Sequence, residues 1–374
     1  MSRIYLSPPD ISQKDRSAVE SAFDSGWVAP VGPDLDAFEA EVASRVDRSY
    51  ACAVNSGTSA LHLALLTLGI QPGDRVICPS LTFAGCAFPI SYCGAEPIFV
   101  DSELDTWNMD PNLLKSAIET SLAEGNKPKA VIVVQIYGQC AKMDLILALC
   151  NEYQIPVIED AAESMGATYK GKPAGSFGDL SFLSFNGNKI ITTSGGGMLL
   201  GDDQGLVEKA RYLSQQARES VLHYEHKAIG YNYRLSNLLA ALGRSQLIDL
   251  DRRIAIRKKH FEAYSQSIGE LPGISFMPIL SEGAPNYWLS CMIIDRAQSK
   301  VSRDDLISIC HEASIEVRPT WKPLHMQTVF QKKQIFGGGV SERLFHDGLC
   351  LPSGSNLSYE DRGKVISTLS FALK

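Results

Sequence analysis

One lysine of the sequence follows a turn in a setting that favours chemistry at its amine. Residues 179–197 begin with an apolar, β-rich run that carries Ser184, break at an Asn-Gly-Asn turn and then deliver Lys189. A lysine held on a rigid turn is a candidate for Schiff-base formation, because its surroundings can favour the neutral, nucleophilic amine. From the spacing alone, a solvated surface lysine is the alternative.

Two other polar stretches follow predicted strands. A short apolar strand at 51–54 runs into the small residues 55–59 and a helical run at 60–68. A strand, small-residue turn and helix in this order direct backbone N–H groups at one point and suit a phosphate, although Ser and Thr are also ordinary N-caps. The strand at 155–160 ends in Asp160, which is either a functional acid at the carboxyl end of a strand or a cap of the next turn.

The elements that must position these groups alternate between strand and helix. Further strands are expected at 75–79, 97–101 and 130–138, and helices at 11–23, 34–46, 82–92, 112–121 and 143–153. Asp34 is the predicted N-cap of the second helix, whose apolar side carries Leu35, Phe38 and Val42. The run at 130–138 is apolar throughout, as expected for a central parallel strand covered on both faces. The alternation predicts an α/β sheet with ligands at the carboxyl ends of its strands.

The length of 374 residues exceeds that of a typical single domain, and the character of the sequence changes near residue 250. We expect a large domain over residues 1–250 and a small α+β domain over 251–374, with the N-terminal segment packing near the small domain. A long basic helix begins at residue 251, and we interpret it as a solvated helical face rather than a nucleic-acid patch. A strand at 287–294 and a helix at 303–313 follow.

Composition excludes several classes of protein. The net charge of −7 and the absence of a long basic run argue against nucleic-acid binding. No stretch approaches the about 18 consecutive apolar residues of a membrane span, and the N-terminus lacks the apolar core of a signal peptide, so we expect a cytoplasmic protein that does not bind membranes. Nine cysteines without a C-x-x-C pair predict reduced, mostly buried thiols rather than disulfides or a metal site.

The candidate groups together supply the contacts that pyridoxal phosphate needs. The stretch at 56–59 would hold its phosphate. Asp160 would keep the pyridine nitrogen protonated, and Lys189 would bond to the cofactor and later move a proton. A dinucleotide-dependent dehydrogenase is disfavoured because no G-x-G-x-x-G follows the first strand.

The sequence resembles the DegT/StrS-type sugar-nucleotide aminotransferases over nearly its whole length. The motifs that carry the resemblance lie at residues 25–27, 56–61, 82–83, 137–139, 159–163, 184 with 189, and 230–234. The resemblance implies an aspartate-aminotransferase-like (fold type I) enzyme, in which a large domain with a mostly parallel seven-stranded sheet binds pyridoxal phosphate.

The resemblance also implies how the cofactor is held. Gly57, Thr58 and Ser184 would bind its phosphate, and Phe83 would stack on its ring. Asn232 would reach across a homodimer interface to the phosphate in the partner's site, so that the two subunits share their active sites.

Three further positions bear on the reaction. By resemblance, Asp160 would meet the pyridine nitrogen and Lys189 would be the catalytic lysine; relatives with His at the lysine position perform dehydration, so Lys189 favours transamination. Many relatives carry Gln or His at the position of Glu163, near the phenolic oxygen of the ring. A carboxylate would repel a phenolate there, so Glu163 must share a proton or turn toward Lys189 or the substrate.

The proline-broken loop at 315–326 suits an anionic, ring-bearing ligand, although a surface loop with a pinned tryptophan is the alternative. The residues that we expect to bind substrate are Arg234, Arg318, Trp321, Lys322 and His325.

Three segments resemble most closely the bacterial C4-aminotransferases of the bacillosamine pathway; they lie at 186–189, 318–325 and 350–354. Those enzymes use L-glutamate to aminate UDP-4-keto-6-deoxy-N-acetylglucosamine, which gives a UDP-4-amino sugar for bacterial glycans. Perosamine synthases, which act on a GDP-4-keto-6-deoxy sugar, are the alternative, and they share residues 105–110 and the Asn-Lys turn at 188–189. A regulator that binds cofactor and sugar nucleotide without turnover is an alternative of another class, and the intact Lys189 speaks against it.

Overall fold

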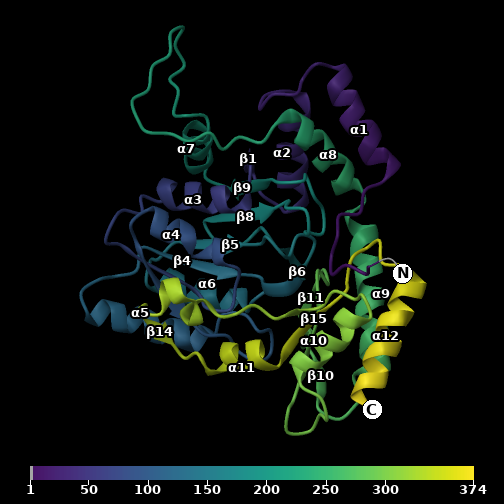
Figure 1. The fold of residues 1–374 in the computed structure, drawn as a ribbon. Coiled ribbons are helices and arrows are strands. Elements are labelled where there is room, and N and C mark those ends of the chain that lie inside the picture. Colours follow the sequence, from purple (N-terminus) through teal and green to yellow (C-terminus); the bar gives the residue numbers. More distant parts are fainter. Residues whose placement is uncertain (1–2) are drawn as a thin grey trace.

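The computed structural model describes residues 3–374, and its largest feature is an eight-stranded sheet with the order β1-β9-β8-β5-β4-β2-β3-β14 (Figure 1). Its strands are β1 (Tyr50–Val54), β2 (Arg75–Pro79), β3 (Glu96–Val100), β4 (Ala130–Val134), β5 (Val157–Asp160), β8 (Leu180–Ser184), β9 (Gly197–Gly201) and β14 (Ile335–Phe336). The five ladders that connect β8 to β14 are parallel, whereas β9 runs antiparallel to β1 and β8. The predicted mostly parallel sheet is confirmed, and β14 adds an eighth strand that is too short to show a sequence pattern.

Helices of the first 250 residues pack on this sheet and on one another. They are α1 (Gln13–Asp24), α2 (Pro33–Arg45), α3 (Gly57–Thr67), α4 (Phe88–Tyr92), α5 (Pro111–Ala123), α6 (Met143–Glu152), α7 (Gln204–Ser214) and α8 (Asn237–Ile248). Helix α3 is apolar around most of its circumference because it is buried beside β8 and β9. All five residues of β4 are buried, as predicted for a central strand.

The C-terminal residues form a second, antiparallel sheet with the order β10-β12-β15-β13 and its own hydrophobic core. The elements of this region are α9 (Leu250–Ile268), β10 (Ile274–Phe276), β12 (Ser290–Ile294), α10 (Arg303–Glu312), β13 (Arg318–Pro319), α11 (Gly339–Asp347), β15 (Gly348–Leu351) and α12 (Tyr359–Leu373). A small third sheet joins β6 (Thr168–Tyr169), β7 (Lys172–Pro173) and β11 (Gly283–Ala284). The N-terminal segment lies against this region, where Ile4 bridges to Ile315, while β14 returns to the large sheet. The domain boundary at residue 250 stays a prediction.

Two predicted helix starts need correction. Helix α2 begins at Pro33 after Gly32, and Asp34 is not its N-cap; proline suits the first helical turn because its missing N–H needs no partner there. Asp34 instead pairs with Arg244 at 2.7 Å. The helix predicted at 82–92 is divided into a short 3₁₀ turn, η1 (Ala84–Cys86), and α4, whose first turn contains a proline.

The basic helix is present as α9. Contrary to the prediction of a solvated helical face, its inner face is buried. Arg253 and Arg257 are each 1% exposed, and their guanidinium groups donate to the carbonyl oxygens of Asp10 and Trp288. Burial lowers the pKa of Arg257 to about 9. These arginines therefore tie α9 to the N-terminal segment and to the residues before β12.

All nine cysteines are buried with free thiols, which confirms their predicted burial. Within residues 3–374, no helix combines the length and apolar character needed to cross a membrane.

Candidate active site

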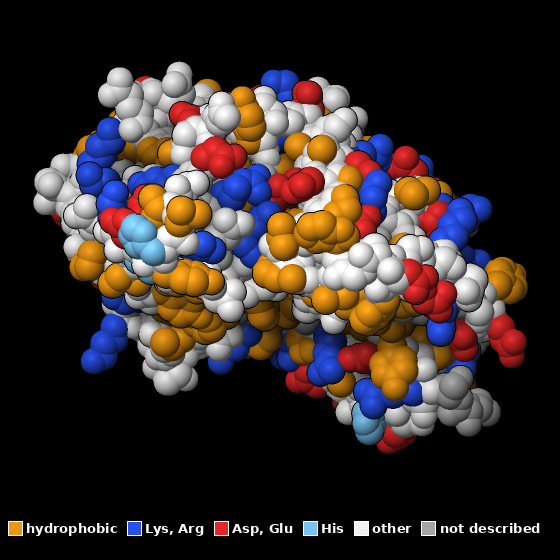
Figure 2. All heavy atoms as spheres, turned by 90° about the horizontal axis from the view of Figure 1, so that it is seen from above, with side chains coloured by type: hydrophobic (Ala, Val, Ile, Leu, Met, Phe, Trp, Pro, Cys, Tyr) orange, Lys and Arg blue, Asp and Glu red, His pale blue; other side chains and the backbone are white. Residues whose placement is uncertain are grey.

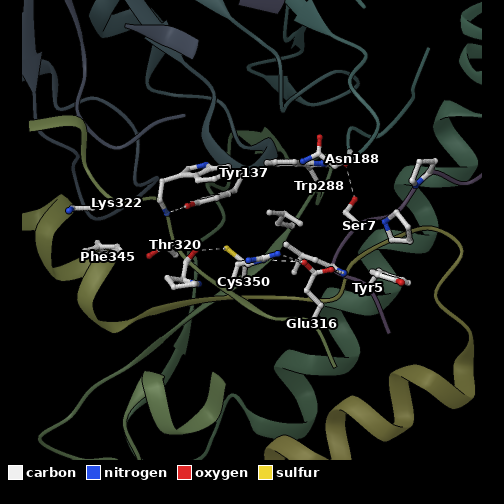
Figure 3. Close-up of a pocket in the computed structure, with 17 residues that line it drawn as sticks. Tyr5, Ser7, Tyr137, Asn188, Trp288, Glu316, Thr320, Lys322, Phe345 and Cys350 are labelled. Atoms are coloured by element: carbon white, nitrogen blue, oxygen red, sulfur yellow. Dashed lines mark hydrogen bonds and ion pairs between the residues drawn. The ribbon is translucent and has the colours of Figure 1, made fainter. Parts of the chain in front are cut away.

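Lys189 lies in the turn between β8 and β9, and its side chain is only 12% exposed. Its Nζ atom is 3.5 Å from Oε1 of Glu163 and 4.1 Å from the ring centroid of Trp288. The preceding carbonyl, that of Asn188, accepts hydrogen bonds from Nε1 of Trp288 (2.8 Å) and Oγ of Ser7 (2.9 Å) (Figure 3). The turn is therefore fixed by the N-terminal segment and by a residue just before β12, and Lys189 is not a solvated surface lysine.

Lys189 faces a cavity of about 350 Å³, the smaller of two adjoining cavities. Seven of the residues predicted to bind the cofactor line it: Gly57, Thr58, Phe83, Asp160, Glu163, Ser184 and Lys189. The structure thus brings together residues from four separate stretches of the chain.

The N-terminus of α3 forms one wall of the smaller cavity. The side chain of Ser56 caps the helix by accepting from the backbone N of Ser59 (3.0 Å), while the amides of Gly57 and Thr58 have no intrahelical carbonyl to bond. A Cβ on Gly57 would lie 3.1 Å from Cβ of Ser184, so glycine permits the close approach of α3 and β8. The free amides and the helix dipole suit an anion.

Asp160 occupies the end of β5, between β4 and β8, and is 7% exposed. Its Oδ1 accepts from the backbone N of Ala162 (3.1 Å). Burial raises the pKa of Asp160 to about 7, against the opposing effects of the Ala162 hydrogen bond and of Lys189, while Glu163 raises it further. A cationic ligand at this carboxylate would restore its charged form.

Consecutive side chains of a strand point to opposite faces of the sheet, so Glu159 faces the side opposite to Asp160. Glu159 accepts from Gln135 Nε2 and from the backbone N of Phe177, both at 2.8 Å, and burial raises its pKa to about 7. Glu159 does not line either cavity and serves to connect β4, β5 and the segment before β8.

Glu163 adopts one of the two orientations expected for it. Its Oε2 accepts from the backbone N of Tyr137 (2.8 Å), and its Oε1 faces Lys189. Tyr137 has a φ of +54°, which is uncommon for a bulky residue, and this conformation aims its amide at the carboxylate.

The larger cavity, shown in Figure 3, has a volume of about 760 Å³. It adjoins the smaller one, because Asn188 and Trp321 line both. The N-terminal residues 5–9 form part of its wall. The backbone N of Trp321 donates to the Tyr137 hydroxyl (2.7 Å), and the two rings stack with centroids 6.3 Å apart. Trp321 also lies 5.8 Å from the ring of Phe83, so aromatic side chains surround the junction of the cavities.

Two of the residues predicted to bind substrate, Arg318 and Lys322, line the larger cavity. Arg318 is bound by an internal carboxylate, because its Nη2 lies 2.8 Å from Oε1 of Glu316. Glu316 in turn accepts from the backbone N of Leu6 (3.1 Å). An anionic ligand would therefore compete with Glu316 for Arg318.

Three predicted site residues lie outside both cavities. The His325 ring bonds Ser80 Oγ through Nδ1 (2.6 Å) and Glu342 through Nε2 (3.0 Å), so both of its nitrogens are already engaged. The buried guanidinium of Arg234 is bound to Glu39 at 2.6 Å. Arg234 and Asn232 line a separate surface cavity beside α7.

Sequence reasoning missed the roles of Trp288, Tyr137 and Ser7 around the lysine turn. Trp288 was read as part of a strand, but β12 begins two residues later, after Tyr287 with its φ of +55°. Tyr137 was noticed only as part of a motif. Nothing in the sequence shows that the N-terminal Ser7 bonds to the turn before Lys189.

A largely buried lysine, a helix N-terminus and a strand-end carboxylate around one cavity of a mostly parallel sheet define a class of protein: the pyridoxal phosphate enzymes of fold type I. Within that class, the chain belongs to the DegT/DnrJ/EryC1/StrS aminotransferase family, whose family model matches residues 9–370.

Named relatives agree with this assignment over almost their whole length. The chain is 49% identical over 371 residues to EpsN of Bacillus subtilis (strain 168), assigned as a pyridoxal phosphate-dependent aminotransferase, with 98% of this chain and 95% of EpsN covered. It is 36% identical over 372 residues to the GDP-perosamine synthase of Caulobacter vibrioides, with 99% and 98% covered. A solved structure of Spr1654 from Streptococcus pneumoniae, assigned as a sugar aminotransferase and determined in its PLP form, is similar with a TM-score of 0.91 at 25% identity, covering 99% of this chain and 98% of that chain.

The protein is therefore a pyridoxal phosphate-dependent sugar aminotransferase, and its family implies a sugar nucleotide and an amino donor as substrates. The smaller cavity fits the cofactor on physical grounds. The unbonded amides of α3 suit its phosphate, and the buried carboxyl of Asp160 suits a protonated ring nitrogen. When bound, the cofactor supplies an electron sink for amino-group transfer.

Proposed function

We propose that this enzyme transfers the amino group of L-glutamate to C4 of UDP-4-keto-6-deoxy-N-acetylglucosamine, giving a UDP-4-amino sugar for bacterial glycan synthesis in the cytoplasm. The observation that carries the proposal is the larger, aromatic-walled cavity beside the lysine cavity, with Arg318 and Lys322 on its lining. Aromatic rings suit a sugar and a base, and the two cations suit a diphosphate.

The residues of the smaller cavity take separate roles in this proposal. Gly57, Thr58 and Ser184 would hold the cofactor phosphate, and Phe83 would cover the ring. Asp160 would pair with the ring nitrogen.

Lys189 would bond to the cofactor and move the proton between carbon atoms in both half-reactions. The Glu163 carboxylate lies 3.5 Å from its Nζ and would keep the amine oriented when it is free. Trp321 and Phe83 would exclude water from the junction of the cavities.

We also propose a homodimer with shared sites. The segment between α7 and α8 projects from the body of the subunit (Figure 1) and exposes apolar side chains, among them Leu222, Tyr224 and Ile229. Figure 2 looks onto the molecule from above, at the face from which this segment projects in Figure 1, and shows hydrophobic side chains between charged groups there. Asn232 follows this segment and lies outside the smaller cavity of its own subunit, which agrees with a role in the partner's site.

A GDP-4-keto-6-deoxymannose substrate is the second candidate, because the relatives include GDP-perosamine synthases at 35–36% identity. A panel of UDP- and GDP-linked 4-keto sugars, scored for glutamate-dependent amine formation, separates the two. We expect the UDP-N-acetyl sugar to have the highest kcat/KM. A higher value for the GDP sugar would overturn the proposed substrate while leaving the aminotransferase activity intact.

A further inference from the structure

Trp288 is held in one orientation by three hydrogen bonds and is 1% exposed. Its backbone N donates to Oδ1 of Asn286 (2.8 Å), and its carbonyl accepts from the buried Arg257 (2.6 Å). Its indole N–H donates to the carbonyl of Asn188, the residue directly before Lys189. The position of the ring is thus tied to the backbone that carries the lysine.

The face of this ring lies against the amine of Lys189. The distance from Nζ to the ring centroid is 4.1 Å, within the range of about 6 Å over which a cation is attracted to an aromatic face, and tryptophan binds cations best. Oε1 of Glu163 is 3.5 Å from the same Nζ atom. Trp288 and Glu163, the two groups that contact this amine, are both buried. Burial strengthens such a contact because little water competes for the ammonium.

We propose that Trp288 is a positioning residue whose ring holds the free ammonium of Lys189. The inference rests on the proposed role of Lys189 as the group that moves the proton. Transamination leaves this amine free between the two half-reactions, and a free lysine side chain can adopt many rotamers. The ring and Glu163 limit that freedom and keep the amine beside the cavity.

The competing role for the same ring is that of a cavity wall, because Trp288 also lines the larger cavity. If it served only as a wall for the sugar nucleotide, its electronic character would affect only the half-reaction with the sugar. If it holds Lys189, both half-reactions depend on it, since the lysine acts in both.

The test replaces Trp288 with tryptophans that carry one to four fluorine atoms, which weaken the negative face of the ring while keeping its shape and its N–H. The buried Trp107 receives the same series as the matched control, because it lines neither cavity. We expect the rates of both half-reactions to fall with each fluorine at position 288, by about two- to thirtyfold across the series, and to stay unchanged for position 107.

A second readout does not depend on turnover. Enzyme loaded with pyridoxamine 5′-phosphate is treated with a trace of acetic anhydride, and the acetylation of Lys189 is compared by mass spectrometry with that of the exposed Lys14. Acetylation of Lys189 should rise with fluorination at position 288. Unchanged acetylation, or a loss confined to the sugar half-reaction, would overturn the inference. Appreciable turnover by Lys189→Ala would instead refute the role of Lys189 in the proposed function, so the two failures are distinguishable.

Discussion

At the scale of the residue, the carboxyl group of Asp160 lies at a strand end where burial raises its pKa to about 7. Its charged form, which would pair with a protonated ring nitrogen, is therefore lost as the pH falls below about 7 in protein without cofactor. We expect the affinity for pyridoxal phosphate to decrease between pH 8 and pH 6. Equilibrium titrations followed by absorbance measure this dependence.

Asp160→Asn is the variant that checks this assignment. It removes the titrating group, so the pH dependence of cofactor affinity over the same range should flatten. It should also slow the glutamate half-reaction on the order of a hundredfold, because the electron sink loses its fixed charge. An unchanged rate in single-turnover measurements would place the essential carboxylate elsewhere.

A second prediction for a single residue concerns Arg318, whose ion pair with Glu316 limits how much its removal should change KM for the sugar nucleotide. Arg318→Ala should raise KM for the sugar nucleotide about tenfold, the low end for a charge-assisted contact, because the guanidinium is largely exposed and Glu316 competes for it. The matched variant, Glu316→Gln, should lower the same KM. The glutamate half-reaction should not change in either variant; equal losses in both half-reactions would show that Arg318 supports the fold instead.

At the scale of the element, the junction of β9 with α3 depends on a glycine. A Cβ on Gly197 would lie 2.5 Å from the carbonyl carbon of Ser56, and backbone cannot yield as a flexible side chain can. Gly197→Ala should therefore destabilise the protein by about 1–3 kcal/mol in urea unfolding and weaken cofactor retention. Gly339→Ala is the control, because a Cβ there meets nothing within 4 Å. Equal stability of the two variants would contradict this account of the junction.

The elements also show why part of the site could be predicted. The strand, turn and helix around Gly57, the acid at the end of β5 and the lysine after β8 are local patterns, and local patterns are visible in a sequence. The two acids at the end of β5 look alike in sequence, and strand alternation alone separates their roles.

The parts that the sequence did not show depend on long-range contacts. Ser7 meets Asn188 across 181 positions, and His325 meets Ser80 across 245. His325 therefore looked available for substrate although its ring is engaged, and Trp288 looked like a strand residue although it contacts Lys189. The N-cap of α2 was misplaced because a proline at the first position competes with an acidic N-cap signal.

At the scale of the whole molecule, the proposed sharing of sites between subunits predicts complementation. Asn232→Ala should weaken cofactor retention, and Lys189→Ala should be inactive. Mixing the two variants should form heterodimers in which one site carries both lesions and the other carries neither. Activity should partly return, in proportion to subunit exchange followed by mass spectrometry. If exchange is complete and no activity returns, Asn232 serves its own subunit.

The most direct test of the central claim follows the cofactor spectrum through both half-reactions in a single sample. L-Glutamate alone should bleach the yellow colour of the purified enzyme, and subsequent addition of UDP-4-keto-6-deoxy-N-acetylglucosamine should restore it with formation of one UDP-4-amino sugar per site. This result requires the lysine cavity and the larger cavity to act in sequence on the two substrates. An enzyme that stays yellow with glutamate, or one that bleaches and is not restored by the UDP sugar, would contradict the account.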